Sequence, residues 1–343
     1  MTLLAAHRLN DIPVLIGDAV CTAPDSRSLK KKIYLITPNL AVGWTGYAIT
    51  AASVIGEMRS ALNDKTVTRS ALESFFKGFQ CHGMYKRDVK IVGWIIDDQP
   101  SPFIWQSSYP SEVFYNDYYF EGSGERYYES LLESNLLGGI TPNRDGVINV
   151  ALAAAHEALM HCGQAFFSEQ LDYATWDRTF GFAYEVIVYG YGRFWPLGST
   201  MYLPCIYHWD QQTETGRSEW TRRIWKMLFF GDYSVLQRNE YKEGKVFPTH
   251  HVIRPVYPHE IDLNQVRTLT FNTEADFYVH YFVLHPSPIE GWRLGMCIVG
   301  DETSDKVSII RTNERMRFHV NTAFLNEKFR EAIRSVSQRG NSH

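Results

Sequence analysis

The sequence predicts an α+β fold of four layers, an αββα sandwich in which two antiparallel sheets lie between helical layers. Two observations predict it. Up to about residue 190, the expected elements run as two hairpins, two helices, two strands, two helices and one strand. Beyond that point the chain is irregular, aromatic and punctuated by Pro and Gly. We therefore expect a first domain over residues 1–190 and a C-terminal extension or domain over residues 191–343.

Two hairpins begin the chain. Residues 3–8 (LLAAHR) and 12–17 (IPVLIG) are apolar runs on either side of an Asn-Asp turn. Residues 33–36 (IYLI) and 40–46 (LAVGWTG) repeat the arrangement around the turn TPN. Short apolar runs that flank turn-forming residues are typical of antiparallel hairpins.

Periodicity predicts the remaining elements. In the first domain we expect helices over residues 47–62 and 67–79, the second capped by Thr68, then a strand over 89–96, an extended stretch to 120, helices from 122 and over 147–170, and a strand over 182–190. In the C-terminal half we expect a short helix over 218–230, strands over 277–285, 292–300, 306–311 and 316–320, and a helix over 322–336.

Composition excludes several classes of partner. The net charge of -4 gives no basic surface for nucleic acid. The N-terminus lacks the pattern of a signal peptide, and no apolar run reaches the roughly 18 residues of a membrane-spanning helix. Five singly placed cysteines fit a reducing compartment better than a disulfide framework. We expect a cytoplasmic protein without a nucleic-acid or membrane partner.

Two histidine groups suggest metal binding only weakly. His156 and His161 lie on one expected helix, but four residues separate them, whereas ligands on one helix face need three between them. A loop carries a second group that lacks any spacing template for a metal, consisting of His250, His251, His259 and Glu260. We therefore expect no metal and interpret these residues as ordinary structural histidines.

Thr2 is the residue that points to chemistry. A hydroxyl is a weak nucleophile at neutral pH and needs a base beside it. Once Met1 is removed, Thr2 carries both the hydroxyl and a free α-amine whose ordinary pKa is near 8. A nearby lysine would keep that amine neutral by like-charge repulsion, and an aspartate would hold the lysine in place.

The residues that follow resemble the active-site set of proteasome β-subunits and the related HslV and Anbu peptidases, which are N-terminal nucleophile hydrolases. Asp18 follows Thr2 by sixteen residues and Gly46 follows Lys32 by fourteen, as in that family. The resemblance covers about residues 2–189 and implies the four-layer sandwich. It also implies that Thr2 attacks an amide carbonyl, that Asp18 and Lys32 tune its amine, and that the Gly46 N–H stabilises the oxyanion.

Two later motifs extend the resemblance. Residues 121–129 (EGSGERYYE) are similar to the family's Gly-Ser-Gly before a helix, which implies that Ser123 supports the free N-terminus. WDRTFGF is similar to the motif that supplies a further aspartate, here Asp177. The sequence departs from that motif because Phe180 stands at the serine position and Phe182 at the second glycine. Thr179 is an alternative donor at this point.

The resemblance also implies the substrate. A peptide or amide would be cleaved without a cofactor, and by analogy the protein would assemble as a homo-oligomer. The pocket for the side chain before the cut bond would be lined by Cys21, Lys30, Tyr34, Trp44 and Ala48. Because Trp44 is bulky, we expect a shallow pocket that prefers small side chains.

Two alternatives remain. One is a catalytically inactive scaffold, as proteasome α-subunits are, although those carry an N-terminal extension and here the first strand starts directly after Thr2. The other is a small-molecule amidase of the same N-terminal nucleophile chemistry, which the unusual C-terminal half would permit. A threonine-type peptidase or amidohydrolase is the function that we expect.

Overall fold

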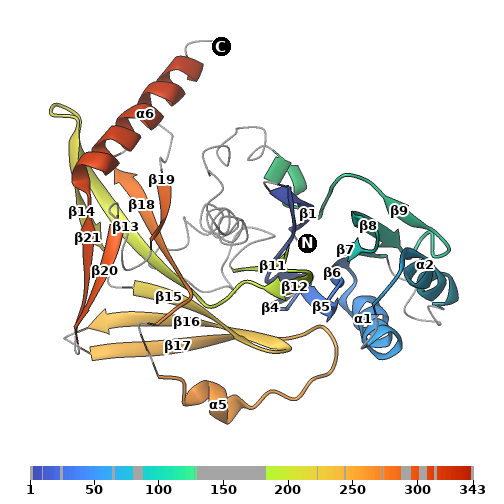
Figure 1. Ribbon diagram of the computed structural model, residues 1–343. Helices are drawn as coiled ribbons and strands as arrows, with labels where there is room; N and C mark the ends of the chain where they lie inside the picture. Colours follow the sequence, from blue (N-terminus) through green and yellow to red (C-terminus); the bar gives the residue numbers. More distant parts are fainter. Residues whose placement is uncertain are drawn as a thin grey trace.

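The computed structural model describes most of the chain outside residues 130–182 (Figure 1). The described residues are 3–9, 11–23, 26–63, 66–79, 88–126, 128–129, 183–221, 223–242, 245–270, 272, 274–286, 295–300, 307–312 and 315–340. The predicted helix over 147–170 and most of the helix predicted from 122 lie outside these residues.

The first hairpin belongs to a five-stranded sheet in the order β10-β1-β2-β11-β12, antiparallel throughout. Its strands are β1 (Leu4–Leu9), β2 (Ile12–Asp18), β10 (Tyr119–Glu121), β11 (Tyr184–Gly190) and β12 (Arg193–Pro196). β12 follows residue 190 and pairs with β11, so this sheet continues to Pro196. The predicted hairpin over residues 3–17 and the strand predicted over 182–190 are confirmed.

The second hairpin begins another antiparallel sheet, in the order β5-β6-β7-β8-β9. Its strands are β5 (Ile33–Thr37), β6 (Leu40–Gly46), β7 (Val89–Ile96), β8 (Pro100–Gln106) and β9 (Val113–Tyr115). Ile33, Ala41, Val92 and Trp94 share a buried core with Leu4, Ala6 and Leu15 of the first sheet. The two sheets therefore pack on each other.

Two helices cover the second sheet. α1 (Ala48–Leu62) and α2 (Arg69–Gly78) form one core with the strands β5 to β8. Thr68 caps α2, because its hydroxyl accepts the N–H of Ala71 at 3.2 Å. The helices predicted over 47–62 and 67–79 are thus confirmed. A small hairpin that the sequence did not suggest, β3 (Val20–Ala23) and β4 (Ser26–Leu29), lies in the polar stretch between Asp18 and Lys32.

The C-terminal half contributes the largest sheet, in the order β17-β16-β15-β13-β18-β19 with β14 beside β13. Only the pairing of β13 with β18 is parallel among its described pairs. Its strands are β13 (Thr200–Asp210), β14 (Thr215–Trp220), β15 (Arg223–Phe230), β16 (Tyr233–Lys242), β17 (Lys245–Ile253), β18 (Phe277–His285) and β19 (Gly295–Gly300). The C-terminal half also contains a separate two-stranded sheet, formed by β20 (Val307–Thr312) and β21 (Arg315–Val320), and the helices α5 (Leu263–Arg267) and α6 (Thr322–Gly340). The predicted terminal strands and helix are thus confirmed.

The predicted four-layer αββα sandwich is wrong. Of the described residues, 53% are in strands and 21% in helices, so the fold is β-rich. The cause is the C-terminal half. Val14, Ile16 and Val186 of the first sheet belong to one core with Trp225 and Val279 of the C-terminal sheet. Figure 1 shows β1, β11 and β12 between the C-terminal sheet on one side and α1 and α2 on the other.

The helix predicted over residues 218–230 is also wrong, because this segment forms the end of β14 and all of β15. β15 pairs with β16 along its whole length, from Arg223 opposite Glu240 to Phe230 opposite Tyr233. Ile, Trp and Phe favour strands where such a partner is present. Tertiary pairing therefore overrides the helical spacing of the local sequence.

Candidate active site

Asp18 and Lys32 form a fully buried ion pair. The Lys32 Nζ lies 2.9 Å from the Asp18 Oδ1, and both side chains are 0% exposed. Lys32 also donates to the carbonyl of Val20, and its ammonium lies 5.9 Å from the centroid of the Trp44 ring. A buried ion pair is stable only where further hydrogen bonds satisfy both groups. This pair meets that requirement.

The same carboxylate holds the start of the first strand. The backbone N–H of Leu3, the residue after Thr2, donates to the Asp18 Oδ1 at 2.9 Å, and the Asp18 N–H donates to the Leu3 carbonyl at 3.1 Å. Gly17 permits this packing, because an added Cβ would lie 2.7 Å from the Ile33 side chain. The end of β2 therefore brings the beginning of the chain and Lys32 to one carboxylate.

Gly46 ends β6 in a backbone conformation that favours glycine. Its φ is +101°, and an added Cβ would clash with the Asp88 carbonyl. The residue is exposed, and Trp44, two residues earlier, donates its backbone N–H to the Lys32 carbonyl at 3.0 Å. The strand that carries Gly46 is thus bonded directly to the lysine of the ion pair. The role of Gly46 at an oxyanion stays a prediction.

Of the three remaining predicted catalytic residues, the structure describes only Ser123. Ser123 is exposed and lies just beyond β10, whose Glu121 pairs with Leu4 of β1. The topology therefore brings Ser123 to the end of the sheet where the chain begins. Thr2 and Asp177 lie outside the described residues.

Four of the five predicted pocket residues belong to one hydrophobic core or pack against it. Tyr34 and Trp44 are buried members of the core that α1 and α2 form with β5 to β8, and Cys21 and Ala48 pack against it. The Tyr34 hydroxyl donates to the Lys31 carbonyl at 2.7 Å, and the Trp44 Nε1 donates to the same oxygen at 3.0 Å. Both rings are only 1% exposed, and burial raises the pKa of Tyr34 well above its ordinary value. The fifth residue, Lys30, is half-buried and bridges to Arg254.

A second buried ion pair, between Lys31 and Glu185, is one that the sequence does not predict. Lys31 lies 3.1 Å from the Glu185 Oε1 of β11, and the Ser234 hydroxyl of β16 donates to the same oxygen. The pair lines a cavity of about 280 Å³ beside β5, together with Arg59, Phe229 and Asp232 among others. The sequence shows that Lys31 is next to Lys32, but no local pattern indicates that Glu185, 154 residues away, is its partner.

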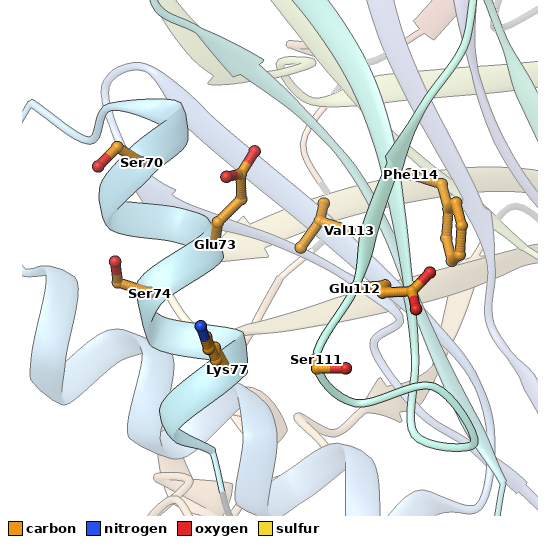
Figure 2. A pocket seen from close by; sticks show the side chains of 8 residues that line it. All are labelled: Ser70, Glu73, Ser74, Lys77, Ser111, Glu112, Val113 and Phe114. Carbon is orange, nitrogen blue, oxygen red and sulfur yellow. The ribbon is translucent and has the colours of Figure 1, made fainter.

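The hollow in Figure 2 is separate from these residues. Ser70, Glu73, Ser74 and Lys77 of α2 face residues 111–114 across a space of about 480 Å³. Its wall contains none of the predicted catalytic residues. Its rim is rich in hydroxyl and charged groups on exposed elements, so it offers no enclosed site for a reaction.

The histidines of the second group, which we interpret as structural from the sequence, are dispersed. His250 and Gln237 lie with their Nε2 atoms 3.0 Å apart, whereas His259 faces Asp232 with 3.6 Å between its Nδ1 and the carboxylate. Within the described ranges, no three His, Cys, Asp or Glu side chains converge as metal ligands would. His156 and His161 lie outside those ranges.

Among the helices described, none combines the length and apolarity that crossing a membrane requires. A comparison of the chain with protein-family models finds no match, and neither does a search of the curated proteins.

Proposed function

We propose that this protein is an N-terminal threonine hydrolase that cleaves a peptide or amide bond once Met1 is removed. The main support for this proposal is the buried Asp18–Lys32 pair, whose carboxylate also accepts the N–H of Leu3. A buried charge pair costs more to desolvate than an apolar pair of similar size. Retaining one directly beside the start of the chain is explained if Lys32 acts on the amine of Thr2.

In the proposed reaction, the Thr2 hydroxyl attacks the carbonyl carbon of the substrate. Its proton passes to the Thr2 amine, through a water molecule, and then to the leaving amine as the amide bond breaks. An ester between Thr2 and the acyl group remains. Water, deprotonated by the same amine, cleaves that ester and restores the free threonine. The backbone N–H of Gly46 stabilises the negative oxygen in both steps.

Lys32 supplies positive charge rather than a proton in this scheme. An ammonium near the Thr2 amine disfavours protonation of that amine, so the amine remains a base near neutral pH. Asp18 positions the ammonium, and the Val20 carbonyl and Trp44 ring complete its surroundings. The cluster therefore fits an electrostatic role for the lysine.

The test is labelling with an electrophile directed at N-terminal threonine, such as a peptide epoxyketone, followed by mass spectrometric mapping. We expect an adduct on Thr2 in protein whose Met1 is removed, and none in Thr2→Ala. Lys32→Ala should lower the labelling rate by up to roughly 10²–10⁴-fold, the usual contribution of a general base, because the Thr2 amine serves as that base only while Lys32 keeps it unprotonated. Lys328→Ala, on the exposed face of α6, is the matched lysine control.

The outcomes separate the alternatives. Folded, Met1-free protein that takes no label and hydrolyses no amide would overturn the proposal in favour of an inactive scaffold. Labelling of Thr2 together with hydrolysis of small amides but not of peptides would replace the peptidase with a small-molecule amidase.

A further inference from the structure

The cavity beside β5 lies where the two halves of the chain meet. One N-terminal sheet supplies Ile33 and Leu35 of β5 to its wall, and the other supplies Ile187 of β11. The C-terminal half adds Phe229 of β15 and Asp232 of the turn that follows. A ligand in this space would therefore contact both N-terminal sheets and the C-terminal sheet at once.

The cavity is distinct from the packed core that contains Tyr34 and Trp44. Successive side chains of a strand point to opposite faces. Ile33 belongs to the core between the two N-terminal sheets and Leu35 packs against it, whereas Tyr34 belongs to the core under α1. The Tyr34 hydroxyl accepts the N–H of Val256 at 2.8 Å, and the whole residue is 1% exposed. The cavity thus opens on the face of β5 that carries Ile33 and Leu35.

The more buried end of the cavity carries the Lys31–Glu185 pair. The two side chains are only 10% and 5% exposed. Among the described residues, the side chains that bond to the Glu185 carboxylate are those of Lys31 and Ser234, and both contact its Oε1. The Lys31 ammonium has three N–H donors, and Glu185 is the acceptor of one. This pair can therefore accept a hydrogen bond on the Glu185 Oε2 and donate another from Lys31.

The more exposed end of the cavity carries a second ion pair. Arg59 and Asp232 lie 2.6 Å apart, with side chains that are 33% and 28% exposed. The charged groups among the described residues of the wall are thus two cations and two anions, so they sum to zero. A buried charge without a counterpart is costly, so this wall favours a ligand whose own net charge is zero.

The remaining wall and the volume set the size and polarity of the ligand. Apart from the charged residues, the wall is mostly apolar, with Ile33, Leu35, Ile187, Pro196 and Phe229 among its members. The volume is about 280 Å³. Since a water molecule takes roughly 30 Å³ of the liquid, this space corresponds to about nine waters and suits a ligand of about nine to twelve non-hydrogen atoms.

We propose that this cavity binds a free α-amino acid with an apolar side chain, of about the size of leucine or methionine. The ammonium of the ligand donates to the Glu185 Oε2, and its carboxylate accepts from Lys31. The side chain lies against Phe229, whose ring centroid is 6.0 Å from the Lys31 ammonium. The inference does not depend on the proposed function, because none of the described lining residues is a predicted catalytic residue.

Isothermal titration of the full-length protein with four compounds tests each contact separately. L-Leucine is compared with 4-methylpentanoate, which lacks the ammonium, with 3-methylbutylamine, which lacks the carboxylate, and with glycine, which lacks the side chain. Leucine should bind saturably at one site. Each of the other three should bind more weakly by roughly tenfold or more, since each loses a hydrogen bond to a charged group or the burial of an apolar side chain.

Two results with the unaltered protein would overturn the proposal. One is the absence of saturable leucine binding up to about 10 mM, a concentration that detects even millimolar affinity. The other is equal affinity for leucine and 4-methylpentanoate, because the ammonium would then have no partner in the site.

Variants assign the binding to this cavity. Glu185→Gln preserves the size of the side chain but removes its charge, so it should weaken leucine binding by roughly tenfold or more. Glu331→Gln, on the exposed face of α6, is the matched control and should leave the Kd unchanged. If circular dichroism shows that Glu185→Gln does not fold, Phe229→Ala replaces it and should weaken leucine binding by roughly fivefold or more. An unchanged Kd for leucine in the folded variant would place the ligand elsewhere and overturn the proposal.

Discussion

The two halves of the molecule bury polar groups differently. The N-terminal sheets enclose two complete ion pairs, Asp18–Lys32 and Lys31–Glu185. The C-terminal sheet buries the neutral side chains of Gln237 and Asn239, the ring of His280 and one lysine, Lys226, which donates to the Asn272 side chain and the Glu274 carbonyl. Within the described residues, both nitrogens of His280 lack a hydrogen-bond partner, and Trp220 and Phe318 contact its ring.

This difference distinguishes buried groups that carry charge from buried groups that only fill space. Replacing a buried ion pair by apolar side chains of similar volume is often neutral or stabilising, so stability alone does not explain why these pairs are present. His280 is held in its neutral form, because burial lowers its pKa to about 3. It can fill space without carrying charge. Under the proposed function, the Asp18–Lys32 pair serves the reaction, whereas we assign a packing role to the buried histidine of the C-terminal sheet.

The largest expected effect is on the Asp18–Lys32 pair. Lys32→Met leaves the Asp18 carboxylate buried with a charge that no ammonium offsets. Removing one partner of a buried pair costs about 3–5 kcal/mol, so the free energy of unfolding should fall by that amount. Urea denaturation monitored by tryptophan fluorescence measures it.

Lys31→Met is the matched control for that variant. The Glu185 carboxylate keeps the Ser234 hydroxyl and borders a cavity that water can enter, so the loss should be smaller. A loss from Lys31→Met equal to or greater than that from Lys32→Met would remove the distinction between the two neighbouring lysines. It would also weaken the argument that Lys32 is held for chemistry.

The sequence contained the local half of this site but not the distant half. Asp18 ends β2 and Lys32, 14 residues later, directly precedes β5 of the other N-terminal sheet, so only the short β3–β4 hairpin separates them, and the resemblance in the sequence already paired them. Glu185 lies 154 residues from Lys31, and Val256 lies 222 residues from Tyr34. Which strands become neighbours over such separations depends on the packing of whole sheets, and no local pattern specifies it.

In the fold, too, the local elements could be predicted from the sequence, whereas the packing of distant strands could not. The hairpins, α1, α2 and the terminal strands follow from alternation and helical spacing within short windows. The wrong fold class came from residues 191–343, whose strands share a core with the first sheet. The segment that became β15 shows the reason: its helical spacing was weaker than the pairing with β16 that only the folded chain provides.

The next effect is on the pH dependence of stability and tests the packing role of His280. Its pKa is about 3 when folded and 6.5 when unfolded, so between these values the unfolded chain binds more protons. The contribution of neutral His280 to the free energy of unfolding is therefore complete above pH 6.5. Below that pH it is lost at about 1.4 kcal/mol per pH unit. His280→Leu should remove this contribution to the pH dependence. Between pH 7 and pH 5, the free energy of unfolding should therefore fall by about 2 kcal/mol less in His280→Leu than in the parent protein.

Urea denaturation of both proteins at pH 7 and pH 5 measures the difference. His7, whose pKa is also lowered to about 3 by burial, supplies a similar slope from the N-terminal sheet and must be left intact in both. Parallel losses of stability in His280→Leu and the parent would mean that the ring is not held neutral. The contrast between paired charges and neutral packing groups would then fail.

The smallest expected effect compares one glycine from each half. Gly46 has a φ of +101° and no room for a Cβ, whereas Gly231, in the turn between β15 and β16, has a φ of +59° and no atom near that position. Gly231→Ala should cost about 1 kcal/mol, the strain of a left-handed alanine. Gly46→Ala should cost about 1–3 kcal/mol, because the backbone must also move.

Thermal unfolding of the two variants measures both losses of stability. Gly46→Ala should in addition slow the labelling of Thr2, whereas Gly231→Ala should not. Equal labelling in the two would show that Gly46 serves the turn at Asp88 and not the oxyanion.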